Sequence, residues 1–192
     1  MQTNTSLTSR QIKEQLLQQK AAVLWLTGLS GAGKSTLAQA LEQELQEQGY
    51  VAALLDGDVL RNGLNKDLGF TDEDRQENIR RAAETAKILL QNGLIVICSF
   101  ITPTEKIRQQ ARQIIGDDYL EVYIKCSFKT CAERDVKGLY QKALRGEIKN
   151  FTGLDAPFEE PQQPWLELDT ENESLEICTQ KLLEKLLPLI KI

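Results

Sequence analysis

The stretch that decides the fold is AVLWLTGLSGAGKST, which runs from residue 22 to residue 36. Its apolar first half is typical of a buried strand, its glycine-rich middle of a turn, and the sequence after it of a helix. The turn fits G-x-x-x-x-G-K-[ST], with Gly28, Gly33, Lys34 and Ser35 at the fixed places. Strand, turn and helix therefore follow one another in the order that the phosphate-binding P-loop requires.

Each part of this turn has a physical reason. Glycines let the backbone come close to a ligand, and successive N–H groups then form an anion-binding nest. The helix that follows adds the positive end of its dipole. Lys34 brings a full charge to the β- and γ-phosphates, and the hydroxyl of Ser35 is suited to Mg²⁺.

The composition excludes several classes of function. The chain has 192 residues, which suits one domain with a sizeable core, and a formal net charge of −5. That charge predicts no broad surface for nucleic acid or anionic membranes, so an anionic substrate needs a local cluster of cations. No apolar run is long enough to span a bilayer. Residues 1–6 lack the basic start and apolar core of a signal peptide.

Histidine is absent from the chain, which removes His-based acid–base catalysis, Ser-His-Asp triads and His-ligated metals. Four cysteines are scattered without metal-ligand spacing. Cys98 and Cys126 stand in apolar runs, which predicts small core residues and fits a reducing cytoplasm. Carboxylates, hydroxyls, lysine and arginine must therefore carry the chemistry.

Strand and helix patterns alternate along the chain. Strands are expected at residues 22–27, 51–55, 94–99, 120–126 and 165–168. Helices are expected at residues 7–20, 34–48, 71–92, 103–115, 128–135 and 174–187, with Pro103 in the first turn of its helix. This alternation predicts an α/β fold with a parallel five-stranded sheet in the middle of three layers. The glycine- and proline-rich residues 136–164 are expected to form a lid or binding loop.

Polar residues follow the strands on the side where such sheets bind ligands. Asp56 and Asp58 follow the second strand, where carboxylates can hold Mg²⁺ or accept a proton from an attacking hydroxyl. The alternative is an ordinary turn, because Asp-Gly is a common turn pair.

A second cationic group stands on the helix expected after residue 71. Arg75, Asn78 and Arg81 or Arg80 recur at helical spacing, so one face can present guanidinium and amide groups together. Guanidinium pairs suit sulfate or phosphate. The alternative is a solvated face whose charges are balanced by acidic residues of the same helix.

Five further blocks of the chain resemble the adenylylsulfate kinase family of P-loop kinases. They are DGDVLRNGLNKDLGF (56–70), ENIRR (77–81), FITP (100–103), KGLY (137–140) and GEIKNFTGLD (146–155). The blocks occur in register, and the resemblance runs from about residue 20 to about residue 190. It implies transfer of the γ-phosphoryl group of ATP to the 3′-hydroxyl of adenosine 5′-phosphosulfate (APS). The products are 3′-phosphoadenosine 5′-phosphosulfate and ADP, in sulfate activation.

The resemblance also implies roles for individual residues. Lys34, Asp56 and Asp58 match catalytic positions, and Ser35 and Asp56 match the Mg²⁺ site. Thr102 stands where the family commonly has a serine described as a phosphoenzyme residue. The ATP-binding positions are Gly28, Leu29, Ser30, Gly31, Ala32, Gly33, Lys34, Ser35, Thr36 and Arg134. The APS-binding positions are Asp58, Arg61, Phe70, Arg75, Asn78, Ile101, Lys137 and Phe151, the last two in the lid.

The chain departs from the family pattern at several positions, which are Asn62, Thr104, Glu105, Val136 and Leu144. Glu105 and Leu144 each replace a cation. The expected organisation is an accessory N-terminal helix within residues 1–20 and a P-loop kinase domain over residues 21–192. The resemblance suggests a cytoplasmic homodimer, with a possible functional link to the ATP sulfurylase that makes APS.

Two other interpretations stay open. The chain can be a different small-molecule P-loop kinase, because a shared fold does not fix a function. It can also be a non-catalytic domain that binds nucleotide or APS and regulates a partner, which the lost cations at Glu105 and Leu144 would fit.

Overall fold

The structure is a computed structural model that describes residues 8–192. Two predictions fall partly or wholly on residues 1–7, which lie outside the described part of the chain. They are the absence of a signal peptide, argued from residues 1–6, and the start of the accessory segment.

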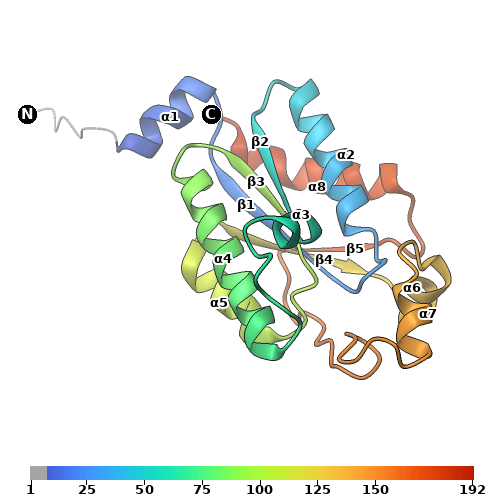
Figure 1. Ribbon diagram of the computed structural model, residues 1–192. Coiled ribbons are helices and arrows are strands. Elements are labelled where there is room, and N and C mark those ends of the chain that lie inside the picture. The colour runs from blue at the N-terminus through green and yellow to red at the C-terminus, as the bar shows by residue number, and fades with distance from the viewer. Residues whose placement is uncertain (1–7) are drawn as a thin grey trace, which may run out of the picture.

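A parallel five-stranded sheet forms the middle of the molecule (Figure 1). Its strands lie in the order β2-β3-β1-β4-β5, and every neighbouring pair is parallel. The strands are β1 (Ala22–Thr27), β2 (Ala52–Asp56), β3 (Ile95–Ser99), β4 (Tyr119–Lys125) and β5 (Leu166–Asp169). The P-loop strand β1 is central and fully buried, as its unbroken apolar run predicts.

Helices cover both faces of the sheet (Figure 1). One face carries α2 (Lys34–Glu47) and α8 (Leu175–Ile190), and the other carries α4 (Asp72–Leu90) and α5 (Glu105–Ile115). β1 feeds both cores, because Leu24 and Leu26 point to the first face while Val23 and Trp25 point to the second. The three-layer α/β fold expected from the sequence is confirmed.

Four shorter helices lie outside these layers. They are α1 (Ser9–Leu17), α3 (Gly57–Asn62), α6 (Phe128–Arg134) and α7 (Leu139–Leu144). Thr8 caps α1 in a capping box with Gln11. Arg10 fastens α1 to the body through both carboxylate oxygens of Asp118, at 2.6 and 2.9 Å. That this segment is a separate accessory unit stays a prediction.

Three details differ from the sequence prediction. Asp56-Gly57-Asp58 opens the short helix α3 in place of an irregular segment, because the side chain of Asp56 accepts the N–H of Asp58 and caps it. α7 interrupts the expected lid. The helix expected from Pro103 begins at Glu105, after the N-cap Thr104. Pro103 stays outside α5, since its carbonyl accepts the N–H of Glu159 at 2.8 Å.

Within residues 8–192, every helix falls short of the length and apolarity needed to cross a membrane.

Candidate active site

The P-loop turn depends on glycine at its first position. Gly28 has a φ of +155°, and a Cβ added there would lie 2.5 Å from the carbonyl oxygen of Ile124 on β4. Any side chain would therefore push the loop off the neighbouring strand. Gly33 is the N-cap of α2, with a φ of +97°. The loop that the motif predicts is thus built as a close backbone turn over a helix N-terminus.

Lys34 holds its ammonium group over this loop. Its Nζ donates to the carbonyl oxygens of Gly28 and Leu29 at 2.9 and 2.7 Å, and the residue is 8% exposed. Burial lowers the pKa of Lys34 to about 8. The ammonium is therefore a poorly solvated charge, and a bound phosphate would stabilise it.

The ends of β2 and β3 meet the start of α2 at a second polar group. The hydroxyl of Ser35 donates to a carboxylate oxygen of Asp56 at 2.7 Å and lies 3.2 Å from the hydroxyl of Ser99. Sheet register explains the meeting, since Asp56 pairs with Ser99. Burial alone would raise the pKa of Asp56, but hydrogen bonds from Ser35 and two backbone N–H groups outweigh it and hold that pKa below its usual range.

This group fits Mg²⁺ by its chemistry. The described residues hold no cluster of three or more metal-ligating carboxylate, thiol or imidazole side chains. Mg²⁺ beside a nucleotide does not need one, because one or two protein oxygens, the phosphates and waters complete its shell. An ionised carboxylate and a hydroxyl 2.7 Å apart supply such oxygens.

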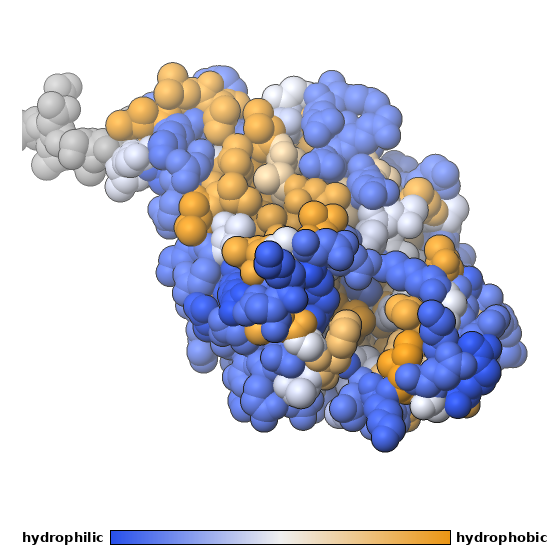
Figure 2. Space-filling model, viewed as in Figure 1, coloured by the Kyte–Doolittle hydropathy of each residue, from blue (hydrophilic) through white to orange (hydrophobic). Residues whose placement is uncertain are grey.

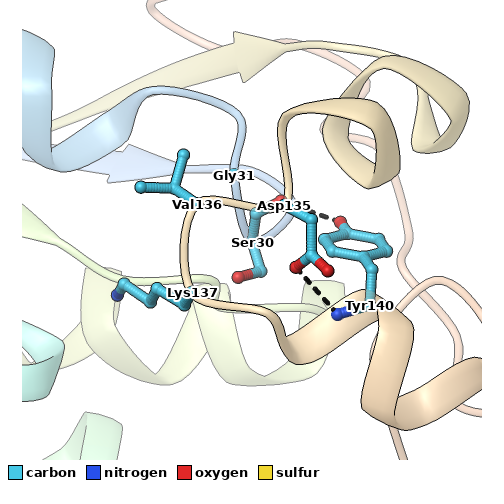
Figure 3. A pocket seen from close by; sticks show the side chains of 6 residues that line it. All are labelled: Ser30, Gly31, Asp135, Val136, Lys137 and Tyr140. Carbon is cyan, nitrogen blue, oxygen red and sulfur yellow. Dashed lines mark hydrogen bonds between the residues drawn. The ribbon is translucent and has the colours of Figure 1, made fainter.

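The second aspartate of the strand end reaches the lid. Asp58 forms an ion pair with Lys137, and both side chains are more than half exposed. Figure 3 shows Lys137 extending away from Tyr140 and Asp135, with which it lines a small pocket beside the P-loop. Tyr140 closes that pocket by donating its hydroxyl to the carbonyl oxygen of Ser30 at 2.7 Å.

Two arginines flank one exposed aromatic ring. Arg61 of α3 lies 4.4 Å from the centroid of Phe70 and Arg75 of α4 lies 5.9 Å from it, and the ring is 62% exposed. Among the residues that the structure describes, neither arginine forms an ion pair with a carboxylate. Burial, and then the charge of Arg75, lowers the pKa of Arg61. Two close cations without anionic partners beside a ring form a site for an anion with a flat base.

Arg75 also connects α4 with the lid. It donates to the carbonyl oxygen of Asn150 at 2.7 Å and to the hydroxyl of Thr152 at 3.3 Å. One turn further along α4, Asn78 is 5% exposed and accepts from the amide of Asn65 at 2.9 Å. Arg75 and Asn78 therefore stand one turn apart on α4, and their joint binding of an anion stays a prediction. Arg81 does not join them, because it pairs with Asp67 and Glu77.

Arg134 lies on the other side of the P-loop. It donates to the carbonyl oxygen of Thr170 at 2.6 Å and approaches that of Gly31 at 3.5 Å. The hydroxyl of Thr170 in turn donates to the carbonyl oxygen of Ala32 at 2.7 Å. The segment after β5 and the end of α6 thus border the loop where a nucleotide base would extend.

The predicted site residues Thr102 and Phe151 are buried in the structure, and Ile101 is half-buried. Ile101 and Thr102 form the turn after β3, and the hydroxyl of Thr102, 1% exposed as a residue, accepts the indole N–H of Trp25 at 2.9 Å. That bond gives Thr102 a structural role, and its role as a phosphoenzyme stays a prediction. Phe151 is 8% exposed and packs edge-on against Tyr140 with centroids 4.8 Å apart, so its expected stacking on a substrate also stays a prediction.

Four residues of the site escaped the sequence analysis. Ser99, Tyr140, Thr170 and Asn65 all touch a predicted site residue. Ser99 carried a signal, because it ends a strand beside the P-loop strand. Tyr140 and Asn65 stood in blocks that resemble the family, but only tertiary contact reveals their partners.

The two halves of this site suit two anionic ligands side by side. The P-loop half holds the phosphates of a nucleotide, and the Arg61–Phe70–Arg75 half offers cations and an aromatic face to a second molecule. With a parallel sheet in this strand order, the protein is a nucleotide-dependent phosphotransferase of the P-loop class.

Comparison with known proteins narrows the class. The family model described as adenylylsulphate kinase matches residues 20–169. The adenylyl-sulfate kinase of Phocaeicola vulgatus is 54% identical over 96% of this chain and 91% of its own, and that of Clostridium acetobutylicum is 53% identical over 92% and 88%. The Mycobacterium tuberculosis APS kinase, solved with AMPPNP and APS, is 42% identical with a TM-score of 0.84, covering 87% of this chain and 98% of that one. The chain belongs to the adenylylsulfate kinase family.

Proposed function

We propose that the protein transfers the γ-phosphoryl group of ATP to the 3′-hydroxyl of APS, giving 3′-phosphoadenosine 5′-phosphosulfate and ADP. The observation that carries this proposal is the Arg61–Phe70–Arg75 cluster, whose two cations beside an exposed aromatic residue suit an anion that carries adenine. Family membership and the relative solved with AMPPNP and APS support it.

Phosphoryl transfer needs alignment and charge stabilisation more than covalent chemistry. The backbone of residues 28–36 holds the β- and γ-phosphates, and the ammonium group of Lys34 stabilises the negative charge that develops between them during transfer. Ser35 and Asp56 would hold Mg²⁺, and the ion would supply charge neutralisation for the phosphates during transfer. Asp58 accepts the proton of the attacking hydroxyl, and its exposed ion pair with Lys137 links it to the lid.

The acceptor half of the site binds both ends of APS, which are the adenine and the phosphosulfate. Phe70 offers its exposed side chain to adenine, while Arg61, Arg75 and Asn78 donate to the phosphosulfate. Ile101 forms the wall between this half and the P-loop. On the nucleotide side, Arg134 borders the ATP base. Transfer is direct and in line, because the buried hydroxyl of Thr102 is engaged with Trp25.

The test is release of ADP by the purified protein with Mg-ATP, with APS as acceptor and with gluconate, adenosine monophosphate and water in parallel. We expect ADP release that depends on APS and on Mg²⁺, together with the 3′-phosphorylated product. Turnover on another acceptor but not APS would support a different small-molecule kinase. Binding of both nucleotides without turnover would support a regulatory domain and contradict the proposal.

The exposed apolar surface of the protein and its free cysteines bear on its assembly and its location. α1 exposes Ile12 and Leu16, at 48% and 79%, and Figure 2 shows apolar surface running from α1 over the part of the body that carries β2 and β3. A homodimer that buries this surface is the assembly we infer. The four cysteines are free and buried, which supports a reducing compartment such as the cytoplasm. A functional link there to an ATP sulfurylase that supplies APS is part of the same proposal.

A further inference from the structure

The turn between β3 and α5 has an unusual backbone. Thr102 has a φ of +46°, in the left-handed region that a β-branched residue rarely adopts. Such a conformation costs free energy and persists only where surrounding contacts hold it. The contacts around residues 101–102 therefore decide where this turn lies.

On one side the turn is fastened to the P-loop strand. The hydroxyl of Thr27 donates to the carbonyl oxygen of Ile101 at 2.7 Å, and the N–H of Gly28 reaches the same oxygen at 3.4 Å. Any shift of Ile101 would thus be felt at the first residue of the P-loop. The turn therefore lies directly against the P-loop half of the site.

On the other side a single buried arginine reaches the turn. The side chain of Arg108, on α5, is 2% exposed, and its Nη1 donates to the carbonyl oxygen of Thr102 at 3.2 Å. Its Nη2 donates to Glu105 at 2.8 Å, and its Nε lies 3.2 Å from a carboxylate oxygen of Glu121 on β4. One planar group therefore connects a helix, a strand and the turn.

Stability alone does not account for this arrangement. A buried ion pair of this kind gains little over apolar packing, because both ions lose their hydration. Glu121 also forms an ion pair with a second arginine, Arg112, at 3.3 Å. What Arg108 has and Arg112 lacks is the contact with the backbone of Thr102, the residue in the costly conformation.

We propose that Arg108 is a positioning residue for the acceptor site, which holds the left-handed turn at Thr102 and thereby sets the place of Ile101 against Gly28. The proposal rests on the proposed function, because it takes Ile101 as a wall of the APS site. Arg108 touches neither substrate. It acts through the carbonyl oxygen that it binds and through the turn that this oxygen anchors.

The first test compares Arg108→Gln with Arg112→Gln, each assayed with APS and ATP varied separately. A displaced wall in a site built for alignment is costly. We expect Arg108→Gln to raise KM for APS about tenfold, with a smaller change in kcat and in KM for ATP. Arg112→Gln is the control, because it also removes an ion pair of Glu121. We expect it to leave kcat and both KM values close to those of the wild type. Equal changes in both variants would overturn the proposal.

The second test is rescue by glycine, which adopts a left-handed φ without strain. If Arg108 is needed because Thr102 resists its conformation, then Arg108→Gln should cost less when position 102 is already Gly. We expect the loss in kcat/KM for APS to shrink by about fivefold in the Thr102→Gly background. Additive losses would contradict the mechanism.

A third readout does not depend on activity. Trp25 donates to Thr102, so its fluorescence reports on the turn, and Trp165→Phe removes the other tryptophan. Arg108→Gln should shift the emission of Trp25 in that background, and Arg112→Gln should not. An unshifted emission in a folded Arg108→Gln protein would sink the proposal. A wild-type protein without APS-dependent turnover would instead sink the proposed function, whatever the fluorescence shows.

Discussion

Lys34 is the residue at which charge and burial oppose each other most clearly. Its ammonium is almost fully buried and is held by two carbonyl oxygens, and its pKa falls to about 8. A lowered pKa means that the folded protein disfavours the charged form relative to the unfolded chain. The buried ammonium group of Lys34 therefore destabilises the ligand-free protein at neutral pH. The same charge is expected to bind the phosphates of the nucleotide.

The sign of the pH effect follows from that. The cost is fully present below pH 8 and disappears as the pH rises through 8 towards the ordinary lysine value of 10.5. A shift of this size corresponds to about 3 kcal/mol. We expect Lys34→Met to abolish turnover yet to unfold at higher denaturant than the wild type at pH 7, with the gain shrinking by pH 10.

Denaturant unfolding of both proteins at several pH values, without nucleotide, measures this difference. Lys142→Met, on the exposed side of α7, is the control for removal of a lysine. A Lys34→Met protein with near-normal turnover would contradict the P-loop assignment. A constant stability difference across the pH range would contradict the burial argument.

Single residues also show how far the sequence alone could reach. The P-loop turn was predictable because its spacing is fixed, and the structure brings Ser35 to Asp56, the two residues expected to share Mg²⁺. Phe151 was expected at the substrate, and the structure buries it against Tyr140. No local pattern distinguishes an aromatic that packs in the core from one that stacks on a ligand.

At the scale of elements, α4 offers a matched pair of arginines. Arg75 reaches the lid and the ring of Phe70, whereas Arg80 points outward and pairs with Glu77 at 2.7 and 2.9 Å. We expect Arg75→Ala to raise KM for APS by about ten- to a hundredfold, because a charge-assisted hydrogen bond is lost, and to change KM for ATP far less. Arg80→Ala should change neither, and equal losses for both substrates in Arg75→Ala would contradict the pocket.

The lid offers a second matched pair. Gly153 and Gly146 have φ values of +91° and +74°, but only at Gly153 would a Cβ meet other atoms, 2.9 Å from Leu29 and 3.2 Å from Phe128. Both Ala variants should lose about 1 kcal/mol from backbone strain. Gly153→Ala should lose about 1–3 kcal/mol more and raise KM for ATP, because Leu29 belongs to the P-loop.

Thermal or denaturant unfolding and initial-rate kinetics on the two variants measure both effects. If Gly146→Ala raised KM for ATP as much as Gly153→Ala does, seating of the lid on the P-loop would not be the cause.

The elements themselves were the easiest part to predict. Within residues 8–192, every strand and six of the eight helices follow from apolar periodicity and end signals, because the sheet buries whole runs and each long helix buries one stripe. The exceptions are α3 and α7, both six residues long. α3 exists because Asp56 caps it through a local contact with Asp58. The start of α5 moved because the carbonyl of Pro103 binds Glu159, which is a tertiary contact.

At the scale of the whole molecule, the surface of α1 needs a partner. The helix is anchored through Arg10 to Asp118, so its orientation is fixed, and yet Leu16 leaves 79% of its surface in water. Ile12 stands one turn earlier on the same side. A specific interface buries about 1,200–2,000 Å², more than one short helix supplies, so the proposed dimer would also use the adjoining apolar surface (Figure 2).

Leu16 should then lie inside the interface between two copies of the chain. A carboxylate at position 16 would be buried in the interface without a partner, or it would keep the two copies apart. Either outcome raises the dissociation constant of the dimer. We expect Leu16→Glu to convert the dimer to a monomer at micromolar concentration, while Gln15→Glu, an exposed neighbour with the same added charge, leaves the dimer intact. Light scattering across a range of concentrations measures the mass of each. Dimeric Leu16→Glu would move the interface away from α1, because the ion pair of Arg10 keeps the helix in place in both variants.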